Sequence, residues 1–477
     1  MRRTVIALLI LTGSVAGPLA AQRPAPLGQP AASGAATSSF EATVDSVVAH
    51  VLAAADVPSA SVAIVRDGRL VYTKAHGLAH VRPDVPATPD MRYPIGSVSK
   101  QFTSAALLLL QEEGRLDLDD RVSRWYPHLT RAGDITIRQL LTHTSGYSDF
   151  WPHDYVPPMM LAAAAPDSIL ARWAGAPLDF EPGTDWQYSN TGYVLAARIV
   201  EKETGMPFMR FLRERIFEPL GMNSVIDFDA GAMTPADPAG YERYGLGPLR
   251  VAPTEAPGWM FGAGGLAMTA SDLARWNLSL ANRTLLSDAS YRELEAEMVL
   301  GNGLATGYGL GVSVGMQGGH RRVAHTGEVS GFVSANYVYP EDGAAVTVLT
   351  NMMAAPAASA IARAVADRLF PATDDGETAR RTALARRIFE QLQQGRVDRS
   401  LLTPNARSYF TERALSDFRV GLGPLGTPQA FEQTGRSDRG GMISRSYRVT
   451  FPDRVLRVWT FETPDGLYEQ YQVAPQL

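Results

Sequence analysis

A serine and a lysine three residues apart form the first pair of side chains that can do chemistry together. Ser97 and Lys100 lie in the stretch 94–102 (PIGSVSKQF), and an apolar run free of proline and glycine follows over 102–110. If a helix begins at Ser97, Lys100 lies one turn later on the same face. A base beside a serine activates it as a nucleophile, and free N–H groups at a helix start bind a developing oxyanion. Because chance produces this spacing about once in a chain of this length, it needs support from other residues.

A tyrosine and an asparagine two residues apart form the second pair. Tyr188 and Asn190 lie in the stretch 182–193 (PGTDWQYSNTGY), directly before a predicted helix. A tyrosine next to a lysine ammonium loses its proton more easily, which makes Tyr188 a candidate general base for Ser97. The amide of Asn190 is suited to orient the lysine or a substrate carbonyl. In isolation, the same pattern is more typical of a buried tyrosine followed by a helix N-cap.

The third stretch, 325–328 (HTGE), lies at the end of a predicted strand. A strand edge can supply a backbone N–H to an oxyanion hole, and Gly327 permits a ligand to approach the backbone closely. His325 is a candidate donor to a substrate carboxylate or to Tyr188. In isolation, a histidine in a turn at a strand end is the ordinary structural interpretation.

These three stretches, in this order, resemble the motifs of the penicillin-recognising serine hydrolases. That family includes class C β-lactamases, D-alanyl-D-alanine carboxypeptidases and related esterases. The resemblance covers about residues 40–369 and extends to three further segments. These segments are 140–146 (LLTHTSG), 219–222 (PLGM) and 262–266 (GAGGL).

The resemblance assigns a role to each motif residue. It implies that Ser97 is the nucleophile, that Lys100 and Tyr188 form the base system, and that the N–H groups of Ser97 and Glu328 form the oxyanion hole. Which of Lys100 and Tyr188 is the true base stays open at this point. The expected substrate-binding residues are Asn190, His325, Gly327 and Glu328.

Two residues depart from the pattern of the family. His325 stands where many members have lysine, and histidine is largely neutral near pH 7, so a permanent cation facing a β-lactam carboxylate is missing. Glu328 places a carboxylate where smaller residues are common, which disfavours anionic substrates. The histidine at position 325 favours an esterase or peptidase over an efficient β-lactamase.

Hydrophobic periodicity predicts a sheet that is split in the sequence by a helical region. The fold class is α/β (α+β), with a β-lactamase-like antiparallel sheet flanked by helices. A cleft between the sheet and the inserted helices is the natural place for a site. Expected strands are 59–65, 69–76, 309–315, 321–326, 331–339 and 345–350, and expected helices are 40–55, 135–142, 191–204, 208–217, 270–280 and 357–369, with a surface loop over 227–258.

Composition shifts divide the chain into five parts. Residues 1–21 have the arginines, apolar run and small residues of a cleaved signal peptide, which predicts a periplasmic or secreted protein. Residues 22–39 are predicted to be a disordered linker, 40–370 the hydrolase domain, 371–378 a second linker, and 379–477 a small α+β domain. This last domain weakly resembles the NTF2-like fold.

The overall composition excludes several classes of protein. The chain has 477 residues, a formal net charge of −5 and no long basic block, which argues against nucleic acid as a partner. It contains no cysteine, so disulfides, thiolate catalysis and cysteine-bound metals are excluded. No metal site is expected, since His76 and His143 are interpreted as structural, and a polar loop over the cleft accounts for the remaining polar cluster. That cluster consists of Asp149, His153 and Asp154.

The combined prediction is a secreted serine hydrolase that acts through a covalent acyl-enzyme on an ester, an amide or a cell-wall peptide. The scheme requires no cofactor, the partner is a small-molecule or peptide substrate, and no stable membrane span is expected after signal removal. The alternatives are a class C-like β-lactamase, a non-catalytic protein that binds penicillin or peptidoglycan peptides, and an acyltransferase. The acyl donor, the role of the last domain and the oligomeric state are not readable from the sequence.

Overall fold

The computed structural model describes residues 36–370, 376–439 and 441–475 of the chain. The predicted signal peptide and most of the first predicted linker lie outside the described residues, as does most of the second linker, 371–378. None of the described helices is both long and apolar enough to cross a membrane.

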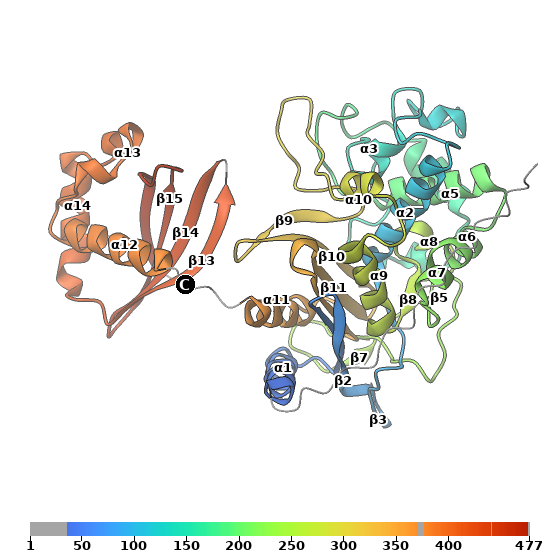
Figure 1. The fold of residues 1–477 in the computed structure, drawn as a ribbon, viewed down its shortest axis with the longest axis horizontal. Helices are drawn as coiled ribbons and strands as arrows, with labels where there is room; N and C mark the ends of the chain where they lie inside the picture. The colour runs from blue at the N-terminus through green and yellow to red at the C-terminus, as the bar shows by residue number, and fades with distance from the viewer. Residues whose placement is uncertain (1–35, 371–375, 440, 476–477) are drawn as a thin grey trace, which may run out of the picture.

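A seven-stranded antiparallel sheet forms the centre of the larger unit (Figure 1). The N-terminal hairpin β1–β2 pairs with β12, from Ala60 opposite Thr350 to Val65 opposite Ala345. The predicted sheet, split in the sequence by a helical region, is therefore confirmed. In spatial order its strands are β3 (Asp84–Pro86), β2 (Arg69–Val81), β1 (Ser59–Arg66), β12 (Ala344–Thr350), β11 (Phe332–Tyr339), β10 (His320–Val329) and β9 (Ser313–Gln317).

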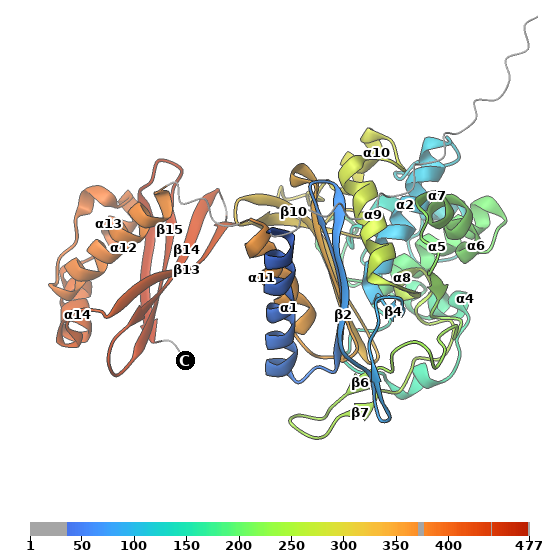
Figure 2. The ribbon, with the colours of Figure 1, turned by 60° about the horizontal axis from the view of Figure 1, so that its bottom comes forward.

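Two helices, α1 (Ala36–Ala55) and α11 (Ala357–Leu369), cover one face of this sheet (Figure 2). Each helix places apolar side chains four residues apart, on one side, against the sheet. The residues with this spacing are Val44 and Val48 in α1, and Ile361 and Val365 in α11, which share one core with Val62, Ile64, Val346 and Val348.

The inserted helical region covers the opposite face. Helix α9 packs directly against β1 and β12, and α2 is buried from Lys100 to Leu110, which explains its unbroken apolar run. The helices of this region are α2 (Lys100–Glu112), α3 (Ile137–Leu141), α4 (Pro166–Ile169), α5 (Asn190–Thr204), α6 (Phe208–Leu212), α7 (Glu218–Leu220), α8 (Phe261–Gly264), α9 (Ala270–Asn282) and α10 (Asp288–Leu294).

Short strands join the helical region to the sheet. Three of these strands form a small sheet in the order β4-β8-β5. Strand β4 ends just before Gly96, so its pairing in this sheet fixes where the chain enters the Ser97 segment. The predicted loop 227–258 contains a two-stranded hairpin, β6–β7. The bounds are β4 (Tyr93–Pro94), β5 (Ile226–Asp227), β6 (Tyr241–Glu242), β7 (Arg250–Val251) and β8 (Leu266–Met268).

The C-terminal unit has three helices followed by a four-stranded antiparallel sheet in sequence order (Figure 1). It has its own core, which includes Phe389, Tyr447 and Val458, and it combines helices and strands as the predicted fold class requires. Its likeness to the NTF2-like fold stays a prediction. The elements are α12 (Glu377–Gln393), α13 (Pro404–Tyr409), α14 (Glu412–Leu422), β13 (Ala430–Arg439), β14 (Met442–Thr450), β15 (Val455–Glu462) and β16 (Tyr468–Pro475).

Candidate active site

Ser97 lies in a 3-10 turn, Gly96–Ser99, that leads directly into α2. The sequence predicted a helix beginning at Ser97, and the structure places one tighter turn there before the α-helix starts at Lys100. Gly96 has a left-handed φ of +51°, and a Cβ at this position would lie 2.7 Å from the backbone N of Glu328. The absence of a side chain therefore brings the Ser97 segment against β10, next to the second predicted oxyanion donor.

Lys100 is the centre of the hydrogen-bond network. Its Nζ donates to Ser97 Oγ at 3.1 Å, to Asn190 Oδ1 at 2.7 Å and to the carbonyl of Ala263 at 2.7 Å. The side chain is 0% exposed, and this burial lowers the pKa of Lys100 to about 7, against a smaller opposing effect of Asp149. A lysine with this pKa is neutral in about half of the molecules near pH 7, which is the form that accepts a proton.

Tyr188 contacts this network through its ring. Lys100 Nζ lies 4.9 Å from the ring centroid, but among the described residues no hydrogen-bond partner meets the buried Tyr188 hydroxyl. Burial raises the pKa of Tyr188 well above its usual value, and the nearby Ser97 hydroxyl offsets only part of this. The sequence argument expected a phenolate favoured by the lysine. Burial outweighs the ammonium, so the resting tyrosine is neutral.

Asn190 is oriented by a residue that the sequence analysis did not assign to the site. Asp149 Oδ1 accepts hydrogen bonds from Asn190 N at 2.9 Å and from Asn190 Nδ2 at 3.1 Å. Because the amide nitrogen faces Asp149, the amide oxygen faces Lys100. Burial raises the pKa of Asp149, and hydrogen bonds from the backbone of Asn190 and Trp151 oppose that effect.

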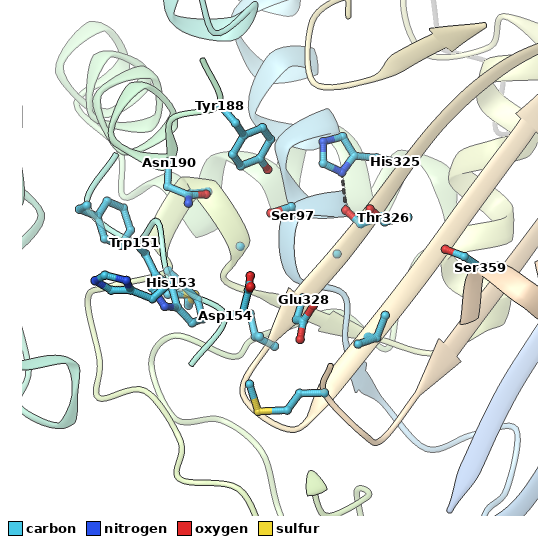
Figure 3. A pocket seen from close by; sticks show the side chains of 18 residues that line it. Ser97, Trp151, His153, Asp154, Tyr188, Asn190, His325, Thr326, Glu328 and Ser359 are labelled. Carbon is cyan, nitrogen blue, oxygen red and sulfur yellow. Dashed lines mark hydrogen bonds between the residues drawn. The ribbon is translucent and has the colours of Figure 1, made fainter. Parts of the chain in front are cut away.

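His325 has both ring nitrogens occupied, and Figure 3 shows one of these contacts, to Thr326. Its Nδ1 faces the Thr326 carbonyl, which can only accept, so Nδ1 carries the proton and Nε2 accepts from the Tyr308 hydroxyl at 2.7 Å. Burial, aided by the charge of Lys100, lowers the pKa of His325 to about 4. In this arrangement His325 is neutral and donates to neither a substrate carboxylate nor Tyr188, which it contacts ring to ring at 6.2 Å.

His143 fixes the segment around Tyr188 through hydrogen bonds and a ring contact. Its Nδ1 accepts from Ser189 N at 3.1 Å, its carbonyl accepts from Gln187 N at 3.0 Å, and its ring centroid lies 4.2 Å from that of Tyr188. His143 therefore has the predicted structural role, and through it His143 positions Tyr188 in the site. The sequence signal for this role was the place of His143 in the family-like segment LLTHTSG. His76, by contrast, lies on β2, where it contacts Tyr72.

Six of the seven predicted site residues border one cavity of about 430 Å³, and the seventh, Lys100, is buried outside this lining (Figure 3). At Gly327 we predicted that a ligand approaches the backbone closely. In the structure the group that approaches is the Ile95 carbonyl, because a Cβ at position 327 would lie 2.0 Å from its oxygen. In the described part of the chain no group of three or more acidic or histidine side chains is placed to hold a metal ion. The polar lining residues are Ser97, His153, Asp154, Tyr188, Asn190, His325, Thr326, Glu328 and Ser359.

Comparison with known proteins agrees with this geometry. The Beta-lactamase family model matches residues 44–370. Penicillin-binding protein 4* of Bacillus subtilis (strain 168) is 30% identical over 302 residues, covering 60% of this chain and 66% of that protein. Protein flp of Staphylococcus aureus (strain COL) is 28% identical over 326 residues, 66% of this chain and 64% of the relative. The chain thus spans slightly less than two thirds of each relative's length.

Solved structures extend the comparison. A D-stereospecific amidohydrolase from Streptomyces sp. has 28% identity and a TM-score of 0.59, covering 69% of this chain and 99% of its own. The D-amino acid amidase from Ochrobactrum anthropi SV3, complexed with L-phenylalanine amide, has 26% identity and a TM-score of 0.59, and the match covers 70% of this chain and 99% of the amidase. The octameric penicillin-binding protein homologue from Pyrococcus abyssi has 22% identity and a TM-score of 0.61, and the match covers 91% of this chain and 99% of that protein. At this identity the likeness shows a shared fold. The chain belongs to the beta-lactamase family of serine hydrolases.

Proposed function

We propose that this protein hydrolyses esters, amides or short peptides through an acyl-enzyme formed on Ser97. One observation carries the proposal: the hydroxyl of Ser97 lies 3.1 Å from the amine of a fully buried lysine whose pKa is lowered to about 7. Such a lysine is a base matched to neutral pH, and it lies within reach of the proton that it must remove.

In the acylation step Lys100, in its neutral form, takes the proton of Ser97 as Oγ attacks the acyl carbon. The carbonyl electron pair moves to oxygen, where the N–H groups of Ser97 and Glu328 stabilise the charge. As the bond to the leaving group breaks, the neutral Tyr188 hydroxyl gives it a proton and recovers one from Lys100. Water then attacks the acyl carbon and gives a proton to Lys100. As the bond between the acyl carbon and Ser97 Oγ breaks, Oγ takes a proton back from Lys100, which releases the acid and regenerates Ser97.

The substrate class follows from the charge on the cavity wall and from the relatives. The neutral, hydrogen-bonded His325 provides no fixed cation for a substrate carboxylate, and Glu328 adds a negative charge. Two structural relatives carry the titles D-stereospecific amidohydrolase and D-amino acid amidase. These observations favour amides and esters without a carboxylate over β-lactams. The intact network of Ser97, Lys100 and Asn190 argues against a non-catalytic binding protein.

The test is a substrate panel with the purified protein. It contains p-nitrophenyl esters, amino acid amides of both configurations, D-Ala-D-Ala peptides and nitrocefin, each measured with Ser97→Ala as the control. We expect turnover of neutral esters and amides that depends on Ser97, with nitrocefin much poorer. Efficient nitrocefin hydrolysis, or no turnover of any ester or amide, would overturn the proposal.

A further inference from the structure

The described residues that line the active-site cavity include the carboxylates of Asp154 and Glu328 but no lysine or arginine. Lys100 is fully buried, is not part of this lining, and its ammonium already makes three hydrogen bonds to protein. His325 is neutral because burial lowers its pKa to about 4. The described wall therefore has two carboxylates and no permanently charged cation to pair with them.

Glu328 is held in place by one of its oxygens. Oε1 accepts a hydrogen bond from Ala354 N at 2.7 Å, while no described residue forms a hydrogen bond or ion pair with Oε2. The carboxylate of Asp154 has no such partner in the described part of the chain. Burial raises the pKa of Glu328, and the negative charge of Asp154 adds to this effect, so the two carboxylates repel each other within the cavity (Figure 3).

Two further lining residues indicate that the cavity is built to hold a polar molecule. The Tyr188 hydroxyl is buried, has no hydrogen-bond partner among the described residues, and belongs to the same lining. Trp151 lies on the Asp154 side of the cavity, and its indole N–H is fixed by a 2.8 Å hydrogen bond to the Tyr155 carbonyl. An aromatic ring beside a cation adds electrostatic attraction to that of the carboxylates.

We infer that the cavity selects substrates that carry an ammonium group, which Glu328 and Asp154 bind while the scissile carbonyl faces Ser97. This inference rests on the proposed acyl-enzyme function and narrows its substrate class. An ammonium group donates three hydrogen bonds and carries a charge opposite to that of a carboxylate, so it can bind both side chains. A metal ion suits them less, because the described residues offer no group of three or more candidate ligands.

The first test uses the unaltered protein and matched substrates. Glycyl, 4-aminobutyryl and 6-aminohexanoyl p-nitroanilides carry the amine at increasing distance from the scissile bond, and each has an acyl analogue without the amine. We expect kcat/KM for at least one amine-bearing substrate to exceed that of its analogue roughly tenfold, the scale of one charge-assisted hydrogen bond. Added salt should reduce this ratio. Equal or lower values for all three amines would overturn the inference.

The second test removes the charges one at a time. Glu328→Gln and Asp154→Asn keep the side-chain shapes, and Glu341→Gln removes an equal charge from an exposed residue elsewhere. We expect the ratio of kcat/KM between amine-bearing and amine-free substrates to fall about tenfold in Glu328→Gln, to fall in Asp154→Asn, and to persist in Glu341→Gln. A ratio that survives in both cavity variants would overturn the assignment.

A competition measurement with the unaltered protein, with Ser97→Ala as its control, separates failure of this inference from failure of the proposed function. Pentylammonium, pentanol and pentanoate compete with a neutral p-nitrophenyl ester in the unaltered protein. We expect pentylammonium to inhibit at the lowest concentration and pentanoate at the highest. If Ser97-dependent ester turnover occurs but the ammonium has no advantage, only the ammonium site is wrong. If no Ser97-dependent turnover occurs, the proposed function itself is wrong.

Discussion

At the scale of single residues, burial determines what each titratable group can do. Burial lowers the pKa of Lys100 into the range where it can act as a base, and the charge of Asp149 opposes this only in part. Tyr188 is buried in the same network, and its pKa rises. The two groups are therefore separated into a proton acceptor and a proton donor, a division that residue types and spacing alone left open.

The pH dependence of turnover tests the base assignment. Lys100 is protonated below its pKa of about 7 and cannot accept the proton of Ser97 in that form. We therefore expect kcat/KM for a neutral ester to rise with pH through about 7 and then to level off. The residual activity of Tyr188→Phe should keep the same midpoint. A rate that is flat or falls from about pH 5 to about pH 9 would contradict Lys100 as the base.

The coupling of Lys100 and Tyr188 gives a second prediction. Lys100→Ala and Tyr188→Phe should each lower kcat by roughly 10²–10⁴-fold, because each interrupts the same proton path. The double variant should lose little more than the more damaged single variant, since residues that act as a unit are not additive. Steady-state kinetics on one ester checks this. Losses that simply multiply would mean that the two residues act independently.

At the scale of elements, close backbone contact sets the geometry of the proposed oxyanion donors. The 3-10 turn Gly96–Ser99 and strand β10 approach each other because Gly96 and Gly327 have no side chains. The sequence predicted that this strand and helix α2 exist, since their periodic patterns are local, but β10 extends to Val329 and the α-helix begins at Lys100 rather than at Ser97. It did not predict that Asp149, His143 and Tyr308 would complete the site, because the residues that they contact lie 41, 46 and 17 positions away in the chain.

A substitution at Gly96 tests this contact. Gly96→Ala would place a Cβ 2.7 Å from Glu328 N at a φ of +51°, so the turn and β10 must separate. We expect a loss of about 1–3 kcal/mol in unfolding free energy from backbone strain. We also expect a drop in kcat of at least tenfold, because a donor moves away from the oxyanion.

Gly133→Ala is the matched control, because a Cβ at Gly133 meets nothing within 4 Å and its φ is not left-handed. Thermal unfolding and ester kinetics of the two variants should therefore differ clearly. Equal behaviour of both variants would show that the approach of Gly96 to β10 is not needed for the site.

At the scale of the whole molecule, the chain has a hydrolase unit and a C-terminal unit with separate cores. The core around Phe389 contains only residues beyond 376, whereas the proposed catalytic residues and the residues that position them all lie before 371. The sequence predicted this division from a composition shift near 371–378. It did not assign a role to the C-terminal unit, because that unit carries no recognisable motif.

The independence of the two units is testable with one core substitution. Phe389→Ala removes a fully buried ring from the C-terminal core and should cost about 3–5 kcal/mol of that unit's stability. Calorimetry of the full chain should show one transition lowered and the other unchanged, and ester turnover should stay within about twofold. A joint shift of both transitions, or a parallel loss of turnover, would mean that the units are coupled.

The central claim is that Ser97 forms a covalent acyl-enzyme, and trapping that intermediate tests it most directly. Turnover of a p-nitrophenyl ester is stopped with acid, and the protein is analysed by intact mass and peptide mapping. The account predicts a mass increase equal to the acyl group on the peptide that contains Ser97, and no adduct with Ser97→Ala, whose turnover should fall below about one per cent. An adduct on another residue, or full turnover by Ser97→Ala, would contradict it.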